Sequence, residues 1–280
     1  MAAWPRGARG ALSLSFDNLG EAAEIELGAL AADTPLGGHF TATRVLPTLL
    51  DALLGRDFAA TFFIEGLNAE LYPDALQKIA ASGHEVAYHA WRHEQWGQLP
   101  AAEQAANLRR GVAAFRALDL APAGMRPPGG ALGPGGVAVL HEAGLRYCSP
   151  AGTGASAEGG VVLLPFQWRH VDASCVLPPL AAARQQMTGS PDPLDPGAFL
   201  AYLEAEIERL VREGGFATVV LHLFMLDWLG EKRLAKLLDA IATQQDLWVA
   251  PCAEIAKQVL AHPKAFAEKT TLDSTSWSGG

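Results

Sequence analysis

Short apolar runs alternate with longer amphipathic segments along almost the whole chain, and this alternation limits the folds that are open to it. Short apolar runs are typical of buried strands, and the longer segments carry apolar residues at helical spacing. This order is typical of parallel strands joined by crossover helices. We therefore predict an α/β fold, a distorted (β/α) barrel of about seven or eight parallel strands, with a doubly wound sheet as the second choice.

The expected strands are shorter than the expected helices. Strands are predicted at residues 11–16, 59–64, 85–87, 145–148, 161–164, 217–223 and 247–250. Helices are predicted at residues 44–54, 73–81, 101–118, 134–143, 199–212, 231–242 and 252–260. Residues 177–197 are rich in Pro and Gly and lack periodicity, so we expect them to form a rim or lid.

These units are expected to form one domain, residues 1–262, followed by a polar C-terminal tail, residues 263–280. Hydrophobic residues make up 50% of the 280 residues, which is enough for a large core. Charged residues make up 18%, below the usual level of about 25%, so extended disorder and a coiled coil are both disfavoured.

Charge limits the kinds of partner that we expect, and the cysteines indicate the redox state of the thiols. A net charge of -9 without a Lys/Arg cluster argues against nucleic acid and favours a small or neutral substrate. The cysteines Cys148, Cys175 and Cys252 are far apart and lack CxxC spacing, so we expect reduced thiols. No apolar run has membrane-spanning length, and the first residues do not resemble a signal peptide. We expect a cytoplasmic protein that binds no membrane, and the oligomeric state, including a homo-oligomer, is left open.

His89 and His93 are the leading candidate for a metal site. Histidines four residues apart lie on one face of a helix or turn, so both rings can reach one divalent cation. They follow a predicted strand, and chemistry in α/β barrels lies at the carboxyl ends of strands. Such a pair is as often two ordinary surface or core histidines, so other residues must decide.

Further polar residues follow predicted strands: Asp17 with Asn18, Arg126, Asp172 and His222. Each has an ordinary interpretation when taken alone. Asp17 and Asn18 can cap a turn, and Arg126 before two prolines can lie in a surface turn. A single histidine inside an apolar run, such as His222, is more often a core residue.

In their order along the chain, these motifs resemble those of the polysaccharide deacetylases (NodB homology, carbohydrate esterase family 4). The resemblance covers residues 11 to 258, and although each motif is weak alone, five in order are specific. The five motifs are SFDN at 15–18 (usually TFDDG in the family), GHEVAYHAWRH at 83–93, RPPG at 126–129, Trp168 with Asp172, and Leu221 with His222. In addition, ATFFIEG at 60–66 resembles the second strand of the family.

The resemblance implies metal-assisted hydrolysis of an N-acyl or related amide bond. Asp17 would be the general base that takes a proton from the attacking water, and His222 the general acid that protonates the leaving amine. Arg126 would orient Asp17 through an ion pair, and Asp172 would orient His222. The cation would bind His89, His93 and residue 18, with Zn²⁺ as first choice and Co²⁺, Ni²⁺ or Fe²⁺ also admitted.

Asn18 departs from the family pattern, which has an aspartate ligand at this position. A neutral amide oxygen can coordinate a cation, but the site loses one negative charge and metal affinity should fall. Three arrangements stay open: Asn18 binds through its oxygen, Asp17 turns to the metal, or one of Glu21, Glu24 and Glu26 contributes. A weakened site completed by Asn18 or water and an empty site carry equal weight.

His39, Tyr88 and Trp168 are the candidate substrate residues. His39 lies on a glycine-rich loop, where a substrate contact and a surface position are equally open. Tyr88 next to His89 can stack on a sugar or planar ligand, or pack in the core. Trp168 belongs to the fourth motif and is expected to contact the substrate.

Three functions follow, in order of preference. The first is metal-dependent N-deacetylation of an acetylated sugar or similar acylated amine, with a small-molecule or oligosaccharide substrate. The second is hydrolysis of a small cyclic amide, imide or ureide in the cytosol, as in allantoinases, which Asn18, the apparent lack of a signal peptide and the acidic charge favour. The third is a catalytically impaired carbohydrate-binding protein, which Asn18 favours and the retained Asp17, Arg126, Asp172 and His222 oppose.

Overall fold

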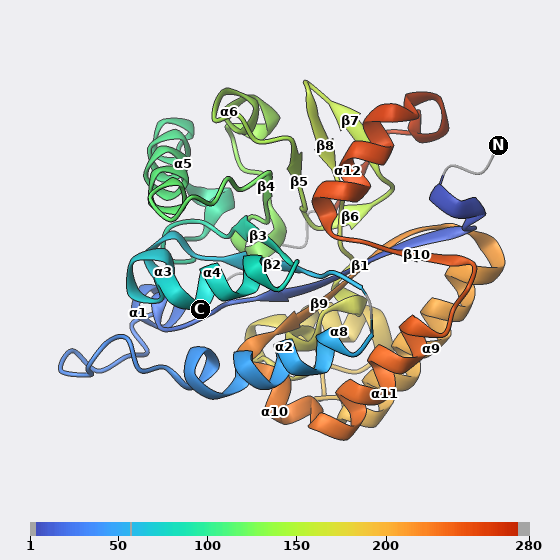
Figure 1. The fold of residues 1–280 in the computed structure, drawn as a ribbon, viewed down its shortest axis with the longest axis horizontal. Helices are drawn as coiled ribbons and strands as arrows, with labels where there is room; N and C mark the ends of the chain where they lie inside the picture. The colour runs from blue at the N-terminus through green and yellow to red at the C-terminus, as the bar shows by residue number, and fades with distance from the viewer. Residues whose placement is uncertain (1–3, 57, 274–280) are drawn as a thin grey trace.

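Strand β1 (Gly10–Asp17) lies at the centre of the fold (Figure 1). The structure is a computed structural model that describes residues 4–56 and 58–273. β1 pairs in parallel with β9 (Gly215–His222) along its whole length. Its other edge pairs with β10 (Leu247–Val249) at the start and with β2 (Thr61–Ile64) at the end.

The main sheet of the described residues has nine strands and is curled. After β2 come β3 (Glu85–Tyr88), β4 (Gly124–Met125), β5 (Tyr147–Cys148) and β8 (Val161–Leu163), all in parallel. Only β7 (Ser156–Glu158), at the edge, is antiparallel. The chain beyond β8 returns to β9 through a parallel bridge between Val171 and Val220. The predicted α/β fold with a distorted, mostly parallel barrel is confirmed.

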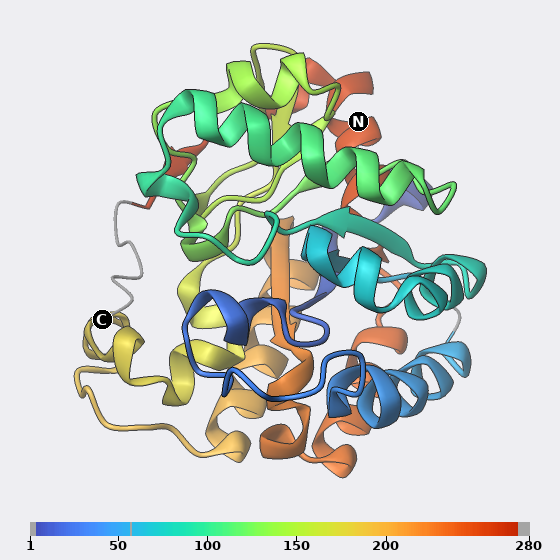
Figure 2. The same cartoon turned by 90° about the vertical axis from the view of Figure 1, so that its left-hand side faces the viewer.

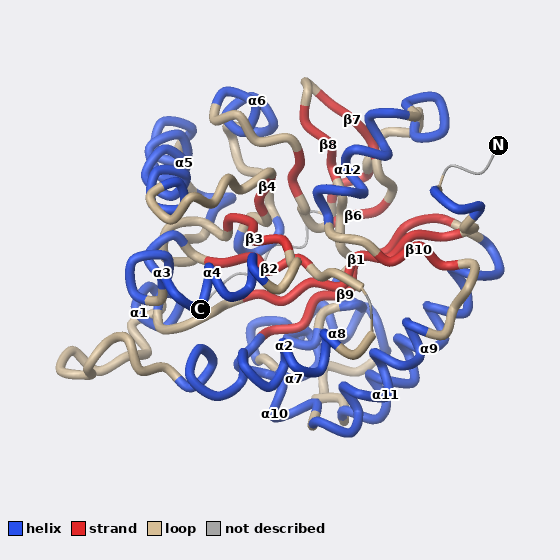
Figure 3. The backbone as a smooth tube through the Cα atoms, in the orientation of Figure 1, coloured by secondary structure: helices blue, strands red, loops and turns tan. Residues whose placement is uncertain are grey.

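Helices cover the outer face of this sheet (Figure 3). In Figure 1, α5 and α6 lie above β1 and β9, and α2, α9, α10 and α11 lie below them. The helices are α1 (Ala22–Glu26), α2 (Leu46–Leu54), α3 (Gly66–Leu71), α4 (Pro73–Ala81), α5 (Ala101–Arg116), α6 (Gly136–Glu142), α7 (Asp172–Val176), α8 (Ala181–Thr188), α9 (Pro196–Glu213), α10 (Leu226–Leu229), α11 (Glu231–Ala242) and α12 (Cys252–Ala261).

The residue alternation of β1 explains how the sheet is used on both faces. Leu12, Leu14 and Phe16 point into the core shared with the outer helices. Residues 11, 13, 15 and 17 point to the opposite face, because side chains alternate along a strand. There Ala11 packs with residues of α12, whose Cys252 contacts the Ser13 hydroxyl at 3.1 Å. The inner face is therefore filled by α12 at the amino ends of the strands and becomes polar toward their carboxyl ends.

Two segments differ from the expected pattern. Residues 177–197, predicted as a rim without periodicity, contain α8, which the run Ala-Ala-Ala-Arg-Gln-Gln-Met of good helix formers explains. Gly189, in the left-handed region at φ 79°, ends that helix. The helix expected at residues 44–54 begins as a π-helix, Thr41–Val45, and continues as α2.

Part of the segment predicted as a polar tail is attached to the domain. A 3₁₀ turn, Pro263–Phe266, brings the Phe266 ring to 4.9 Å from the ring of Trp4. β11 (Thr271–Leu272) pairs antiparallel with β6 (Gly152–Thr153). The rest of the predicted tail, residues 274–280, lies outside the described residues.

All three cysteines are buried free thiols, as the sequence predicts. None of the helices in residues 4–56 and 58–273 combines the length and the apolar character that crossing a membrane requires.

Candidate active site

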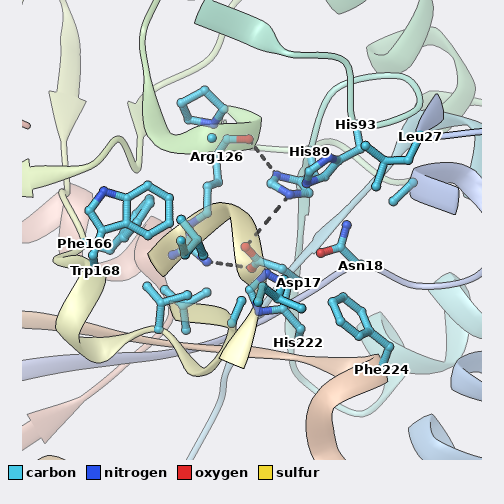
Figure 4. A pocket seen from close by; sticks show the side chains of 18 residues that line it. Asp17, Asn18, Leu27, His89, His93, Arg126, Phe166, Trp168, His222 and Phe224 are labelled. Atoms are coloured by element: carbon cyan, nitrogen blue, oxygen red, sulfur yellow. Dashed lines mark hydrogen bonds and ion pairs between the residues drawn. The ribbon is translucent and has the colours of Figure 1, made fainter. Parts of the chain in front are cut away.

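The predicted polar residues meet in one pocket at the carboxyl ends of the strands. Asp17 and His222 are the last residues of β1 and β9 and are register partners. His89 follows β3, and Arg126 follows β4. Asn18 and His93 line the same pocket (Figure 4). Figure 2 looks onto this end of the sheet, with α1 and the loop after it across the middle of the view.

Arg126 holds Asp17 in a buried ion pair. Its Nη1 atom lies 2.6 Å from Asp17 Oδ1, and the two side chains are 2% and 4% exposed. The other guanidinium hydrogens go to the Ser15 and Ser149 hydroxyls at 2.9 to 3.4 Å. The guanidinium also lies 4.1 Å from the centre of the Phe63 ring. The ion pair and the two serines therefore fix the position of the Asp17 carboxylate at the end of β1.

Asp172 holds His222 in the same manner. Asp172 Oδ1 accepts a hydrogen bond from His222 Nδ1 at 2.6 Å, and Oδ2 accepts one from the His222 backbone N–H at 2.7 Å. Burial lowers the pKa of His222, but the charge and hydrogen bond of Asp172 outweigh it, so the pKa is raised above its ordinary value. The imidazolium form is therefore favoured, with Nε2 left to face the pocket.

His89 and His93 lie in the irregular loop after β3 and not on a helix, and their ring centres are 4.9 Å apart. Burial lowers the pKa of His89 to about 3 and holds that of His93 well below its usual value. Both rings are therefore neutral, the form that binds metals. His89 Nδ1 donates to the Arg126 carbonyl at 2.8 Å, which leaves the Nε2 lone pair, 4.0 Å from Asp17 Oδ2, toward the pocket.

The backbone of the histidine loop is held in unusual conformations. Ala90 and His93 have φ of 61° and 75°, in the left-handed region. Such residues cost about 1–2 kcal/mol each and persist only where other contacts fix them. Glu94 supplies two of these contacts, since its carboxylate accepts from the N–H groups of Trp91 and Arg92 at 3.0 and 2.9 Å.

Asn18 is oriented by Glu65, which directly follows β2 and is fully buried. Glu65 Oε1 accepts a hydrogen bond from Asn18 Nδ2 at 2.5 Å, and Oε2 accepts one from Asn68 at 2.9 Å. The amide nitrogen of Asn18 is thus turned to Glu65 and its Oδ1 atom to the pocket (Figure 4). Within the described part of the chain, this buried oxygen accepts no hydrogen bond.

These donors fit a divalent cation, although weakly. His89 and His93 supply neutral nitrogens, and the unsatisfied Oδ1 of Asn18 supplies an oxygen. No group of three or more His, Cys, Asp or Glu side chains in residues 4–56 and 58–273 is arranged to hold a metal. The third donor is an amide, so a bound cation would keep one more positive charge than with an aspartate.

The acidic residues after Asn18 are engaged elsewhere. Glu21 accepts from the Tyr72 hydroxyl at 2.6 Å, Glu24 lies 3.4 Å from His39, and Glu26 pairs with Arg92 at 3.0 Å. None of these carboxylates lines the pocket. Of these four side chains, only that of Asn18 lines the pocket.

Of the candidate substrate residues, only Trp168 lines the pocket. The Tyr88 side chain is fully buried and donates its hydroxyl to Asn107 at 2.7 Å, so it packs in the core instead of meeting a ligand. His39 contacts the Thr41 hydroxyl at 2.7 Å and holds the loop after α1. An aromatic residue in or beside a motif can therefore lie either in the core, as Tyr88 does, or in the pocket, as Trp168 does.

Sequence reasoning missed the residues that support the predicted ones. Ser15 lies two residues before Asp17, on the same side of β1, and Ser149 and Glu65 directly follow β5 and β2. The rule that strand ends carry chemistry therefore applied to these residues too. Leu27 and Phe224 also line the pocket with apolar side chains, and no motif in the sequence indicates them.

Residues 12–148 match the family model described as Polysaccharide deacetylase. A chitin deacetylase from Colletotrichum lindemuthianum is 37% identical over 105 residues, which are 35% of this chain and 41% of that protein. The chain thus spans about two fifths of the length of that relative.

The fold is similar to that of a candidate polysaccharide deacetylase from Mycobacterium smegmatis, with a TM-score of 0.80, 25% identity and 96% of both chains covered. It is also similar to the PuuE allantoinase, with a TM-score of 0.74, 18% identity and 93% of both chains covered. The motif order, the barrel and the family match together show that the chain carries a polysaccharide deacetylase domain of the NodB homology type.

Proposed function

We propose that this protein is a hydrolase that cleaves a C–N amide bond by N-deacylation, assisted by a divalent cation. The observation that carries the proposal is the register pairing of Asp17 with His222, each held by its own buried partner. A candidate base, positioned by Arg126, and a candidate acid, positioned by Asp172, face one pocket, and hydrolysis of an amide needs both.

The side chains divide the reaction between them. Asp17, held in place by its ion pair with Arg126, takes a proton from the attacking water. His222, whose pKa is raised by Asp172, donates its Nε2 proton to the leaving nitrogen. A divalent cation held by His89, His93 and Asn18 would polarise the substrate carbonyl. Zn²⁺ is the first candidate, because two imidazoles suit it.

Two substrate classes have support. The match to a chitin deacetylase supports an N-acetylated sugar. A small amide, imide or ureide is the second candidate, because most residues that line the pocket are apolar.

Metal content and turnover test the proposal together. We expect Zn²⁺, Co²⁺, Ni²⁺ or Fe²⁺ added to the metal-stripped protein to restore hydrolysis of an amide from a panel of N-acetylglucosamine oligomers and small amides. Asp17→Asn and His222→Ala should each lower kcat/KM about 10²–10⁴-fold. His262→Ala, at an exposed histidine, is the matched control and should leave the rate unchanged. Equal activity of the Asp17 and His222 variants and the wild type would refute the proposed roles.

A further inference from the structure

The walls of the pocket are apolar on both sides of the catalytic groups. Figure 4 shows Phe166 and Trp168 on one side of Asp17, and Leu27 and Phe224 on the other. Leu177 and Leu180, which precede α8, also line the pocket. The parts of a substrate that flank its scissile bond would therefore both meet apolar side chains.

The polar side chains in the pocket offer little to a sugar. The guanidinium of Arg126 is used by Asp17 and two serines, and Nδ1 of His222 is used by Asp172. The remaining polar atoms, such as Asp17 Oδ2 and His222 Nε2, are those that the reaction itself needs. A sugar hydroxyl buried without a partner costs about tenfold or more in affinity.

The mouth of the pocket exposes apolar side chains that nothing in the described chain covers. Leu27 is 53% exposed and Phe224 is 36% exposed, and both line the pocket. Apolar side chains that remain in water beside a cavity are typical of a ligand-binding surface. Contact with an apolar ligand would remove them from water.

A more polar groove lies on the other side of Trp168. It is lined by Gln167, Arg169, Gln186 and Thr153, among others, and contains none of the catalytic side chains. A sugar chain could find partners there, but the polar atoms of that groove do not reach into the pocket that holds the catalytic groups.

We propose, on the basis of the deacylase function above, that the substrate is a small amide with apolar groups on both sides of the scissile bond, rather than a sugar chain. The chemical class is an aliphatic or aromatic acyl group on an apolar amine. Water attacks the carbonyl carbon, the C–N bond breaks, and the products are a carboxylic acid and an amine that receives its proton from His222.

Four amides test the two sides of the bond separately. N-acetylcyclohexylamine is the hydroxyl-free ring counterpart of N-acetylglucosamine, and each is compared with its N-hexanoyl form. We expect the cyclohexyl ring to lower Kd at least tenfold relative to the sugar, measured calorimetrically in the His222→Ala variant. The hexanoyl chain should lower it a further tenfold or more, since each buried methylene contributes about fourfold. Values of kcat/KM in the wild type should follow the same order.

Substitutions inside and outside the pocket test where the apolar amide binds. Leu27→Ser should weaken N-hexanoylcyclohexylamine at least fivefold and leave N-acetylglucosamine unchanged. Leu54→Ser, at a leucine of α2 that is 79% exposed and remote from the pocket, is the control with no expected effect. Gln186→Ala, in the polar groove, should also have no effect.

The outcomes separate this inference from the function on which it rests. Preferred binding and cleavage of N-acetylglucosamine, or a loss of sugar binding in Gln186→Ala, would overturn the apolar substrate and leave the deacylase intact. Cleavage of none of the four amides, with tight binding of the apolar ones, would support the pocket assignment and count against the deacylase. Weak binding of all four would reject the apolar substrate.

Discussion

Asn18 and Glu65 form a buried hydrogen-bonded pair at the position where the family pattern has an aspartate. Glu65 is fully buried and lies behind Asn18, which donates to it at 2.5 Å. An aspartate at position 18 would bring two carboxylates to this distance, where they cannot both ionise. The amide at position 18 is therefore the partner that a glutamate at position 65 requires.

Asn18→Asp should destabilise the metal-free protein by about 2–3 kcal/mol, since it replaces a hydrogen-bonded amide by a second buried carboxyl group, and one of the two must then take up a proton. Adding Glu65→Gln should restore most of the loss, because the glutamine amide can donate to the new carboxylate. Urea unfolding of both single variants and the double variant gives the coupling free energy, expected at about 1.5 kcal/mol or more. Purely additive effects would show that the two side chains act independently.

The double variant has a second expected property. It returns a carboxylate to the pocket and removes the one behind it, so Zn²⁺ should bind more tightly than to the wild type. Calorimetric titration of the metal-stripped proteins measures this directly. Weaker binding by the double variant would show that Asn18 does not contribute a donor atom.

Asp172→Asn should move the alkaline limb of the kcat/KM profile to lower pH. Asp172 raises the pKa of His222 against the effect of burial, so removing its charge lowers that pKa. The acid form of His222 is then lost at lower pH, and activity with it. The rate at neutral pH should also fall about 10²–10⁴-fold. An unchanged alkaline limb, with the rate reduced at all pH values alike, would assign that limb to another group.

At the scale of elements, the histidine loop is fixed by the start of α3. The N–H groups of Gly66 and Leu67 donate to the carbonyls of Ala90 and Trp91, each at 2.9 Å. The indole of Trp91 lies over Gly66, where an added Cβ would come within 2.6 Å of the ring. Arg110 covers the ring from α5, with its guanidinium 3.5 Å from the ring centre. The position of the loop that carries His93 therefore depends on the absence of a side chain at Gly66.

Gly66→Ala should push Trp91 away and distort this loop. We expect a loss of about 1–3 kcal/mol of unfolding free energy, as for other insertions into packed sites. Metal affinity should fall as well, because His89 and His93 lose their relative positions. Gly55→Ala is the control, since a Cβ there meets no atom within 4 Å. Thermal unfolding and Zn²⁺ titration of both variants measure the effects, and unchanged metal affinity in Gly66→Ala would show that the loop tolerates movement of Trp91.

At the scale of the molecule, one end of the barrel holds the candidate site and the other end stabilises the fold. The carboxyl ends of the strands hold the candidate catalytic groups, and the amino ends are closed by α12. Glu85, the first residue of β3, accepts hydrogen bonds from Thr61, Tyr147 and the backbone N–H of Ala253 at 2.9 to 3.0 Å. It thus joins three strands to the start of α12.

Glu85→Ala should cost about 3 kcal/mol of unfolding free energy. The variant leaves the buried Tyr147 hydroxyl without its acceptor and the first turn of α12 without one of its caps. Glu254→Ala, at a neighbouring glutamate of α12 paired only with a surface lysine, should cost less than about 1 kcal/mol. Urea unfolding measures both, and equal losses would place the stabilisation elsewhere.

Most of the barrel could be predicted from the sequence, because its signals are local. The apolar periodicity of α4 and α11 gives their bounds, and five motifs in order give the polar residues of the site. The role of Glu65 could not be predicted, since it depends on the orientation of an amide 47 residues earlier in the chain. The core position of Tyr88 and the apolar walls also depend on packing that no local pattern records.

The pairing of β1 with β9 has a consequence for engineering. Asp17 and His222 end a ladder of eight paired residues, so their spacing is fixed by the sheet. The walls come from other segments, Leu27 after α1 and Leu177 before α8. Exchanging these segments between proteins of this architecture, or randomising them in a library, should change which molecule is accepted without moving Asp17 and His222, the two groups that we propose transfer protons.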